Sequence, residues 1–266
     1  MNNKPSKVLK QLTASVTKND EVMPGVFLFW LESPDIGTEA QPGQFIMVRC
    51  DDYPLPRPIS VHSLADNGNK MALLFAVMGK GTDWLSQRKA GDNIDIFGPL
   101  GNGFSIQPAA RNLLLLAGGM GIAPLYFLAL EAVKKGCSVK LLYGTPNKNR
   151  YPESLLPSQL ELISVTDDGS IGTKGMVTDI LPDFADWADQ IFTCGPLPMY
   201  LDIACRKQEL KLKDKSVQVS LEMRMGCGLG VCYSCTIKTK KGLEQVCKDG
   251  PVFNLDDILW DKLVDI

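Results

Sequence analysis

The stretch LLLLAGGMGIAPLYFLAL, residues 113–130, decides how the middle of this chain folds. Its eighteen residues carry no charge, so it meets the minimum length of a membrane-spanning helix. Gly118, Gly119 and Gly121, followed by Pro124, interrupt the run, and such residues mark tight turns. The stretch therefore predicts a buried strand, a turn and a helix, and we expect no membrane association.

The residues that follow alternate between strand-like and helix-like segments. A helix from Pro124 to Lys135 and a strand from Ser138 to Tyr143 complete a βαβ unit. A lysine-rich connection then precedes a strand at Val217–Leu221. Between these segments we predict two strands and two helices, at Leu162–Val165, Gln190–Cys194, Met176–Leu181 and Pro198–Glu209. Such alternation is typical of an α/β domain built on a parallel sheet.

The amino-terminal part has a different pattern of apolar and turn-forming residues. Its short apolar runs are separated by Gly, Pro, Asn and Asp at the intervals of an all-β barrel or sandwich. We predict strands at Lys7–Val16, Val26–Glu32, Gln44–Val48, Met71–Val77 and Asn93–Phe97. Only Asp83–Arg88 has the pattern of a short helix in this part of the chain.

Length, charge and composition exclude several classes of function. At 266 residues the chain is long enough for two substantial domains and a small appendage. The net charge is −2 and the basic residues are scattered, so we expect no nucleic-acid partner. The polar start MNNKPSK contains no apolar signal segment, and we therefore expect a cytoplasmic protein whose thiols stay reduced.

Four cysteines near the carboxyl end have an informative spacing. Cys227, Cys232 and Cys235 form CxxxxCxxC, and Cys247 follows after eleven intervening residues, as in plant-type [2Fe-2S] proteins. Glycines at positions 226, 228 and 230 allow a tight loop whose backbone amides approach the sulfurs without side-chain clashes. The pattern predicts an iron–sulfur cluster and hence electron transfer.

Other uses of these cysteines stay open at this point. Four thiolates also satisfy zinc, although structural zinc sites usually combine two separated short pairs, whereas three ligands crowd one loop here. A disulfide framework has no support, because no export signal is seen. The other four cysteines stand among apolar neighbours and are expected to be buried thiols, at Cys50, Cys137, Cys194 and Cys205.

Two glycine-containing segments indicate a nucleotide site. Gly118, Gly119 and Gly121 lie between a strand and a helix, where backbone amides and the helix dipole would face a pyrophosphate. The spacing is not a full GxGxxG, because Pro124 takes the third glycine position. The later segment TCGP ends a strand at the same edge of the sheet and adds Cys194, Gly195 and Pro196. Either segment alone could be a simple turn, but together they favour nucleotide binding.

Two segments of the β region suit a phosphate group. The run YPLP followed by RPIS is a rigid extended stretch that would present Arg57 and Ser60 from one strand, and arginine pairs bidentately with diphosphates. In the segment GKGT, Gly81 and Thr82 offer an amide and a hydroxyl to an anion. Taken alone, each segment is more typical of a surface turn.

Taken in order, RPIS, GKGT, GPLGNGF, AGGMGIAP, TCGP and the four-cysteine loop give the chain a family resemblance. It resembles the ferredoxin reductase superfamily along its whole length, and within it the electron-transfer subunits of bacterial NAD-dependent dihydroorotate dehydrogenases. The run LEMRMGCG is the most specific part of the match. The resemblance implies an antiparallel FAD-binding β-barrel at residues 1–108, an NAD-binding α/β domain at 109–213 and a small [2Fe-2S] domain at 214–266.

The resemblance also implies roles for individual residues. Arg57, Pro58, Ile59 and Ser60 would hold FAD, with Ser60 near the flavin ring and Arg57 near the phosphates. Further FAD contacts would come from Leu74, Phe75, Ala76, Gly81 and Thr82. The glycine turn and the TCGP segment would shape the NAD(H) site. The cluster would be ligated by Cys227, Cys232, Cys235 and Cys247.

A partner subunit is implied as well. In this family a catalytic subunit with its own FMN oxidises dihydroorotate, and two copies of each subunit are expected to form a heterotetramer. FAD exchanges electrons singly or in pairs, so this chain itself needs no general acid or base. Two alternatives stay open. One is a flavin and iron–sulfur diaphorase subunit of a cytoplasmic hydrogenase or transhydrogenase complex, and the other is a zinc- and nucleotide-binding module without enzymatic activity.

Two further points depend on geometry. His62, the only histidine, lies just after RPIS, and we expect a structural role because a lone histidine cannot build a metal site with distant cysteines. A preference for NAD over NADP follows from the resemblance alone. The nearest cations for a 2′-phosphate, Lys148 and Arg150, lie in a loop whose direction the sequence does not give.

Overall fold

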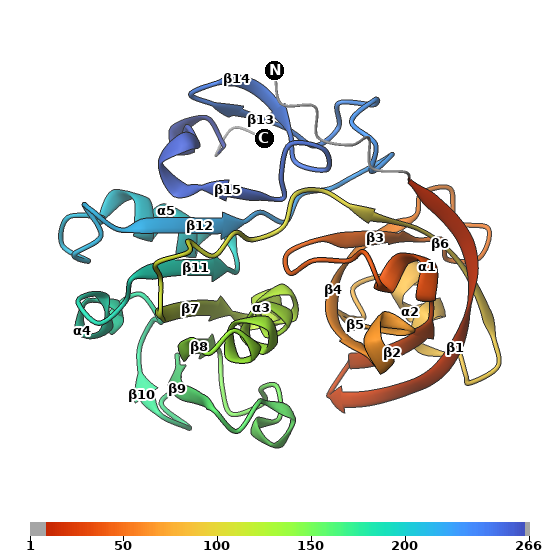
Figure 1. Ribbon diagram of the computed structural model, residues 1–266, viewed down its shortest axis with the longest axis horizontal. Coiled ribbons are helices and arrows are strands. Elements are labelled where there is room, and N and C mark those ends of the chain that lie inside the picture. Colours follow the sequence, from red (N-terminus) through yellow and green to blue (C-terminus); the bar gives the residue numbers. More distant parts are fainter. Residues whose placement is uncertain (1–8, 264–266) are drawn as a thin grey trace.

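The computed structural model describes residues 9–263 and shows three parts (Figure 1). A closed barrel forms the amino-terminal part, a seven-stranded sheet with helices forms the middle, and the carboxyl-terminal segment lies along one edge of that sheet. This is the expected order of barrel, α/β sheet and cysteine-rich segment. The start MNNKPSK, and with it Lys7 of the first predicted strand, lies outside the described residues, as does Val8.

Six antiparallel strands close the barrel in the order β1-β2-β5-β4-β3-β6. Their bounds are β1 (Lys10–Met23), β2 (Val26–Glu32), β3 (Phe45–Val48), β4 (Arg57–Ala65), β5 (Lys70–Ala76) and β6 (Asn93–Leu100). Alternate side chains point inward, and Phe29 and Leu31 of β2 pack there with Leu73 and Phe75 of β5, all buried. The predicted barrel is therefore confirmed.

Two short helices, α1 (Pro34–Gly37) and α2 (Lys80–Ser86), belong to the barrel. α2 begins three residues before the predicted start at Asp83. The Thr82 hydroxyl accepts the backbone N–H of Met78 at 2.9 Å and of Gly79 at 3.2 Å, and these bonds fix the chain at the start of the helix.

The middle part is a sheet in the order β10-β9-β8-β7-β11-β12-β15. Its strands are β7 (Asn112–Gly118), β8 (Ser138–Thr145), β9 (Leu160–Thr166), β10 (Thr173–Lys174), β11 (Gln190–Cys194), β12 (Ser216–Ser220) and β15 (Val252–Asn254). All neighbouring strands are parallel except β15, which runs antiparallel to β12. The carboxyl ends of β7, β8, β9 and β11 therefore meet at one edge, where α/β sheets bind ligands.

Three helices accompany the sheet, namely α3 (Ile122–Lys134), α4 (Leu181–Ala185) and α5 (Leu197–Cys205). α3 starts before Pro124, which lies in the first turn, where its missing N–H leaves no hydrogen bond unmade. The helix predicted at Met176–Leu181 is wrong in position, because α4 starts only at Leu181, with Pro182 in its first turn. α5 ends at Cys205, short of the predicted Glu209.

The carboxyl-terminal part is joined to the sheet. β12 follows the expected boundary at residue 213 and pairs with β11, and β15 pairs with β12, so the sheet continues past that boundary. Outside the sheet lie the cysteine loop and the hairpin of β13 (Thr236–Thr239) and β14 (Gly242–Gln245). The division into three functional domains stays a prediction, and a boundary after Ser220 would leave only β15 on the far side.

One apolar core connects all three parts. Met47 and Leu100 of the barrel, Leu116 of β7, and Cys235 and Cys247 of the cysteine loop belong to the same buried cluster. α3 also packs its residue Phe127 into the barrel core. The relative position of the parts is thus fixed by side-chain packing, since apolar burial stabilises by roughly 25 cal/mol per Å².

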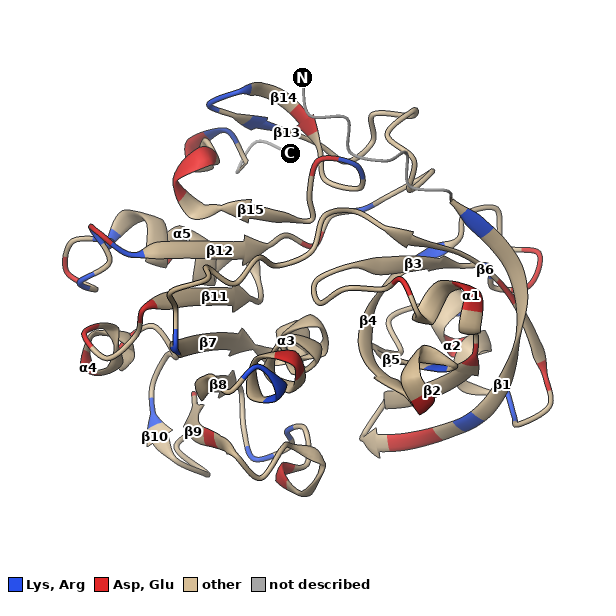
Figure 2. Cartoon of the chain, viewed as in Figure 1, with Lys and Arg blue, Asp and Glu red and all other residues tan. Residues whose placement is uncertain are grey.

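Charged residues are spread over the whole molecule (Figure 2), with Lys and Arg interspersed among Asp and Glu in each part. Within residues 9–263, no helix combines the length and the apolar character that crossing a bilayer requires. Of the four cysteines outside the spaced set, Cys50 and Cys194 are buried and Cys137 is half-buried, whereas Cys205 is exposed. The prediction of a buried thiol is therefore wrong for Cys205, which ends α5 at the surface.

Candidate functional site

Two clefts adjoin in this structure. The smaller, of about 360 Å³, lies over the carboxyl ends of β7 and β11. The larger, of about 940 Å³, lies between β4, β5 and the segment that follows β12. Met120 and Glu222 line both clefts, so a ligand in one would lie next to a ligand in the other. Both volumes are in the range of small-molecule and cofactor sites.

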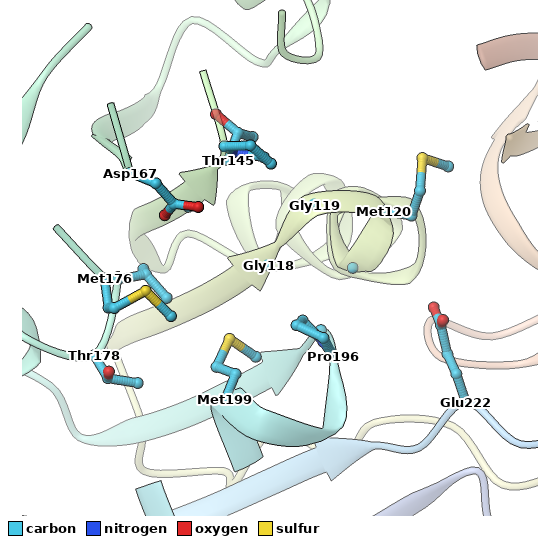
Figure 3. Close-up of a pocket in the computed structure, with 15 residues that line it drawn as sticks. Gly118, Gly119, Met120, Thr145, Asp167, Met176, Thr178, Pro196, Met199 and Glu222 are labelled. Carbon is cyan, nitrogen blue, oxygen red and sulfur yellow. The ribbon is translucent and has the colours of Figure 1, made fainter. Parts of the chain in front are cut away.

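The smaller cleft lies where the strand order reverses. From β7 the chain passes through α3 to β8 on one side, while β11 pairs with β7 on the other side, and such switch points are the ligand sites of α/β sheets. Five of the six residues predicted for the nucleotide site line this cleft: Gly118, Gly119, Gly121, Gly195 and Pro196. Figure 3 labels Gly118, Gly119 and Pro196 among them. The sixth, Cys194, is buried beneath the cleft.

Glycine is required where the two nucleotide-site segments touch. A Cβ on Gly121 would lie 1.9 Å from the carbonyl oxygen of Cys194, and a Cβ on Gly118 would lie 2.7 Å from the Cδ of Pro196. Real Cβ atoms do not come this close to neighbouring atoms. These glycines therefore let the turn before α3 pack on the TCGP segment, and Gly119, with φ +53°, supplies the left-handed residue of the turn.

The far end of the smaller cleft is acidic. Figure 3 shows the Asp167 carboxylate, just after β9, near Thr145 at the end of β8 and near Met176, which follows β10. Among the described residues that line this cleft, Asp167 and Glu222 are charged and none is Lys or Arg. Arg150 donates instead to Ser164 Oγ at 2.6 Å and pairs with Glu153.

The larger cleft collects most of the residues predicted for FAD. Eight of the nine line it, namely Arg57, Pro58, Ile59, Ser60, Leu74, Phe75, Ala76 and Thr82. The ninth, Gly81, packs behind the Arg57 side chain, where a Cβ would lie 2.7 Å from the guanidinium Nε. Arg57 also donates to the carbonyl of Leu55, and Arg224 lines the same cleft, so two cations are available to an anionic ligand.

Glu222 occupies the junction of the two clefts. Although its side chain is open to solvent there, desolvation by the surrounding protein raises the pKa of its carboxyl. The Sγ of Cys194 lies 4.0 Å from its Oε1, and burial raises the pKa of that thiol well above its usual value. Beneath them, the Tyr200 hydroxyl donates to the Ser220 carbonyl at 2.6 Å and accepts the Gly195 N–H at 2.8 Å. These bonds fix the TCGP segment against β12.

Backbone amides surround the sulfurs of the spaced cysteines. The N–H of Leu229 donates to Cys227 Sγ at 3.3 Å, and the N–H of Gly230 donates to Cys247 Sγ at 3.1 Å. The N–H of Cys247 donates in turn to Cys235 Sγ at 3.4 Å. Donors directed at sulfur stabilise thiolates and the clusters that thiolates hold, so the donor set fits an iron–sulfur group.

The four thiols influence one another. Cys232 interacts with Cys227, and Cys247 interacts with both Cys235 and Cys227. Hydrogen bonds from Ser234, and secondarily from Cys227, lower the pKa of the exposed Cys232 thiol to about 6, whereas burial raises the pKa of Cys247 to about 12. Within residues 9–263, no set of three or more His, Cys, Asp or Glu side chains surrounds a point where a single metal ion would fit.

The cysteine loop rests on the barrel. Gly228 has φ +71°, and a Cβ there would lie 2.8 Å from Met47 Cγ of β3. Toward solvent, by contrast, the loop exposes three large apolar residues, Leu229, Val231 and Tyr233, of which Val231 is 69% exposed. One side of the loop is therefore packed against the barrel and the other is an apolar surface.

Comparison with known proteins agrees with this geometry. A family model described as the iron–sulfur cluster binding domain of dihydroorotate dehydrogenase B matches residues 222–259. A dihydroorotate dehydrogenase B (NAD(+)) electron transfer subunit from Desulforamulus reducens is 38% identical over 90% of this chain and 95% of the relative. The chain belongs to this family of electron transfer subunits. The subunit from a Geobacillus species is 35% identical over 95% of this chain and 100% of its own length.

Solved structures extend the comparison. A structure described as an NADH-dependent reduced ferredoxin-NADP oxidoreductase, studied for flavin-based electron bifurcation, is similar with a TM-score of 0.85 and 30% identity. The similarity covers 95% of this chain and 91% of that one. The ferredoxin reductase of carbazole 1,9a-dioxygenase has a TM-score of 0.68 at 20% identity, over 81% of this chain and 70% of its own, and shows the fold alone. The predicted ferredoxin reductase resemblance is thus confirmed.

Several residues of the clefts escaped the sequence analysis. Glu222 lies in the cysteine-rich segment, and only the turn of the chain after β12 brings it to both clefts. The place of Asp167 in the cleft could have been predicted from the sequence, because this residue follows β9 and the carboxyl ends of parallel strands face ligands. Met120 was quoted within the glycine turn, but nothing in the sequence placed its side chain between two sites.

Replacing Gly121 by Ala tests the contact between the two nucleotide-site segments. The added methyl group would overlap the Cys194 carbonyl, and we expect a loss of roughly 1–3 kcal/mol of unfolding free energy and weaker NADH binding. Urea unfolding and NADH titration measure the two effects. Gly79→Ala is the matched control, because its backbone is extended and nothing lies within 4 Å of the new Cβ. Unchanged stability and affinity in Gly121→Ala would contradict the packing argument.

Proposed function

We propose that this chain passes electrons between NAD(H) and a catalytic dihydroorotate dehydrogenase subunit, using FAD and a [2Fe-2S] cluster. The observation that carries the proposal is the junction of two clefts at Met120 and Glu222 in a member of this family. When bound, FAD converts between a two-electron hydride and single electrons, and the cluster carries single electrons. The protein's own task is to bind these groups side by side.

The smaller cleft is the proposed NAD(H) site. The glycine turn and the start of α3 present the positive end of a helix dipole to a pyrophosphate. Thr145 and Asp167 supply oxygen acceptors at the far end, where a ribose diol would donate hydrogen bonds. At the other end, Pro196 and Glu222 lead to the larger cleft, which puts a nicotinamide beside the flavin.

The larger cleft is the proposed FAD site. Arg57 and Arg224 offer guanidinium groups to the diphosphate, and Ser60 offers a hydroxyl to the flavin ring. Leu74, Phe75 and Ala76 form part of its wall, and Leu74 and Phe75 are almost fully buried, so their contribution is backbone and apolar surface. The mixture of a mostly apolar lining with few polar groups is typical of cofactor sites.

The spacing of the cysteines favours a binuclear cluster over zinc. A [2Fe-2S] cluster takes two thiolates on each iron, and CxxxxCxxC followed by a more distant fourth cysteine is the plant-type ligand pattern. A zinc ion would draw all four sulfurs to one centre. We therefore propose [2Fe-2S] as the cluster type and retain zinc as the outcome that metal analysis can reveal.

The catalytic partner is proposed to dock over the cysteine loop. An electron transfer subunit requires a catalytic one, and the exposed apolar residues Leu229, Val231 and Tyr233 surround the proposed cluster site. Apolar surface of this kind is typical of protein interfaces. We propose that the partner carries FMN and that two copies of each subunit assemble.

A second candidate function has one observation in its favour. The chain is 30% identical, over 95% of its length, to a protein described as an NADH-dependent reduced ferredoxin-NADP oxidoreductase. A subunit of a transhydrogenase complex would use the same two clefts and the same cysteines. The two functions differ in the partner, so the partner that co-purifies with the tagged chain decides between them.

Activity of the isolated chain tests the proposal directly. Purified anaerobically, the chain is expected to oxidise NADH with an artificial electron acceptor but to leave dihydroorotate unchanged, because the oxidation of dihydroorotate is assigned to the partner. Adding the catalytic subunit should couple dihydroorotate oxidation to NAD reduction. Dihydroorotate oxidation by the isolated chain would contradict the division of labour between two subunits.

Cys232→Ser tests the cluster assignment. We expect loss of iron and sulfide with FAD retained, because Cys232 lies in the cysteine loop and lines neither cleft. Metal analysis, sulfide assay and the visible spectrum measure both groups. Cys205→Ser, another exposed cysteine outside the spaced set, is the control and should keep iron at the wild-type level. A wild-type protein with one zinc per chain and no iron would contradict the electron-transfer proposal.

Asp167 is expected to favour NADH over NADPH. A 2′-phosphate near this carboxylate would meet a like charge, and no Lys or Arg among the described lining residues offsets it. Asp167→Asn should narrow the ratio of kcat/KM for NADH over NADPH by roughly tenfold, which equals about 1.4 kcal/mol. Asp168→Asn, at the neighbouring exposed carboxylate that does not line the cleft, is the control. An unchanged ratio in Asp167→Asn would argue against this placement of the ribose.

A further inference from the structure

The only histidine of the chain is buried where the barrel meets the helix that follows the glycine turn. His62 belongs to β4 and is 1% exposed. Its Nδ1 lies 2.9 Å from the carbonyl oxygen of Ala123, in the first turn of α3. Its Nε2 lies 3.0 Å from the hydroxyl of Tyr151. One imidazole thus joins a barrel strand to two segments of the α/β part.

The two partners fix the tautomer of the ring. A carbonyl oxygen only accepts hydrogen bonds, so the Nδ1 of His62 carries the proton and donates to Ala123. In the neutral ring, Nε2 is then a bare acceptor and the Tyr151 hydroxyl donates to it. Burial lowers the pKa of His62 to about 4, which keeps the ring neutral at physiological pH.

Aromatic packing holds the ring on both sides. Tyr126, one turn further along α3, stacks on His62 with ring centroids 4.3 Å apart and planes at 18°. Tyr151 meets the ring at 62° with a centroid distance of 5.4 Å, and its own N–H donates to the Tyr143 hydroxyl at 3.3 Å. These ring contacts and the two hydrogen bonds restrict the orientation of the imidazole, so it couples the position of β4 to that of α3.

The strand and the helix that His62 joins are those that line the clefts. β4 contributes Arg57 to Ser60 to the larger cleft, and Ser60 is only two residues from His62. Ala123, whose carbonyl accepts the Nδ1 proton, lines the same cleft, and Met120, three residues earlier, lines both clefts. A displacement of α3 along β4 would change the separation of the two sites.

We propose that His62 is a positioning residue that sets the separation between the nicotinamide and the flavin through its bond to the Ala123 carbonyl. This inference rests on the proposed function, because it concerns hydride transfer between NADH and FAD. Hydride transfer is sensitive to such separation, and a misplacement of about 1 Å can slow a reaction a hundredfold. His62 itself touches neither reacting group and acts through α3.

Nuclear magnetic resonance of the oxidised full chain tests the geometry without any activity. With 15N-labelled histidine, the protein has one imidazole, so its two ring nitrogens give an unambiguous pattern of couplings to the ring protons. We expect the proton on Nδ1 at pH 7 and a neutral ring. A proton on Nε2 alone, or a charged ring at that pH, would overturn the assignment of the bond to Ala123.

Stopped-flow reduction of the flavin by NADH, without oxygen, tests the positioning role. His62→Leu removes both hydrogen bonds and is expected to slow flavin reduction roughly tenfold or more, with the Kd of NADH little changed. His62→Asn offers an amide donor near the Nδ1 position and should recover much of the rate. Because a general loosening of the interface could also slow the reaction, Phe127→Leu, which trims apolar packing of the same helix against the barrel, is the control.

The outcomes separate the two proposals. An unchanged rate in His62→Leu, or an equal loss in Phe127→Leu, contradicts the positioning role while leaving the proposed function intact. A wild type whose flavin is not reduced by NADH contradicts the proposed function and the positioning role together. If His62→Leu does not retain FAD, His62→Phe, which keeps an aromatic ring but removes the donor to the Ala123 carbonyl, is measured instead, and a wild-type rate there overturns the proposal.

Discussion

The contact between Gly121 and the Cys194 carbonyl is the constraint on which both clefts depend. Because no Cβ is present, the turn before α3 packs directly on the end of β11, and the sheet closes at its switch point. That contact fixes where α3 begins. The start of α3 in turn forms a wall of both clefts, through Met120 and Ala123. The absence of a Cβ on Gly121 thus determines where the two proposed ligands would meet.

The barrel strand β4 contributes both to the larger cleft and to the contact with α3. β4 carries the arginine and serine of the larger cleft in its first residues and His62 two residues later. The arginine itself needs a neighbouring glycine, since a Cβ on Gly81 would occupy the space of its guanidinium group. Through the Ala123 carbonyl, the same strand also holds α3. Ligand binding and the contact between the parts are therefore coupled within nine residues of one strand.

The cysteine loop follows a similar rule of close approach. Gly228 lets the loop lie on the β3 side chain of Met47, while backbone amides turn toward the sulfurs. Burial is uneven, because Cys235 and Cys247 lie inside the common core and Cys232 is exposed. Two of the sulfurs therefore face the interior, and a third lies near solvent. An electron carrier between two proteins benefits from such a position, since it is close to both the protein core and the surface.

Much of this protein followed from its sequence because the deciding signals are local. The alternation of apolar residues gave the barrel strands, the switch to strand and helix gave the parallel sheet, and the spacing of Cys227 to Cys247 gave the proposed cluster ligands. The sequence pattern did not give the correct starts of α2 and α4. The hydrogen bonds of Thr82 fix the start of α2, and Pro182 lies in the first turn of α4. Tertiary structure alone decided which distant groups meet. Glu222 lines the same cleft as the glycine turn because β12, which it follows, lies beside β11 in the sheet. His62 contacts Ala123 because the barrel packs on α3. No periodic pattern in the sequence records such contacts between remote segments.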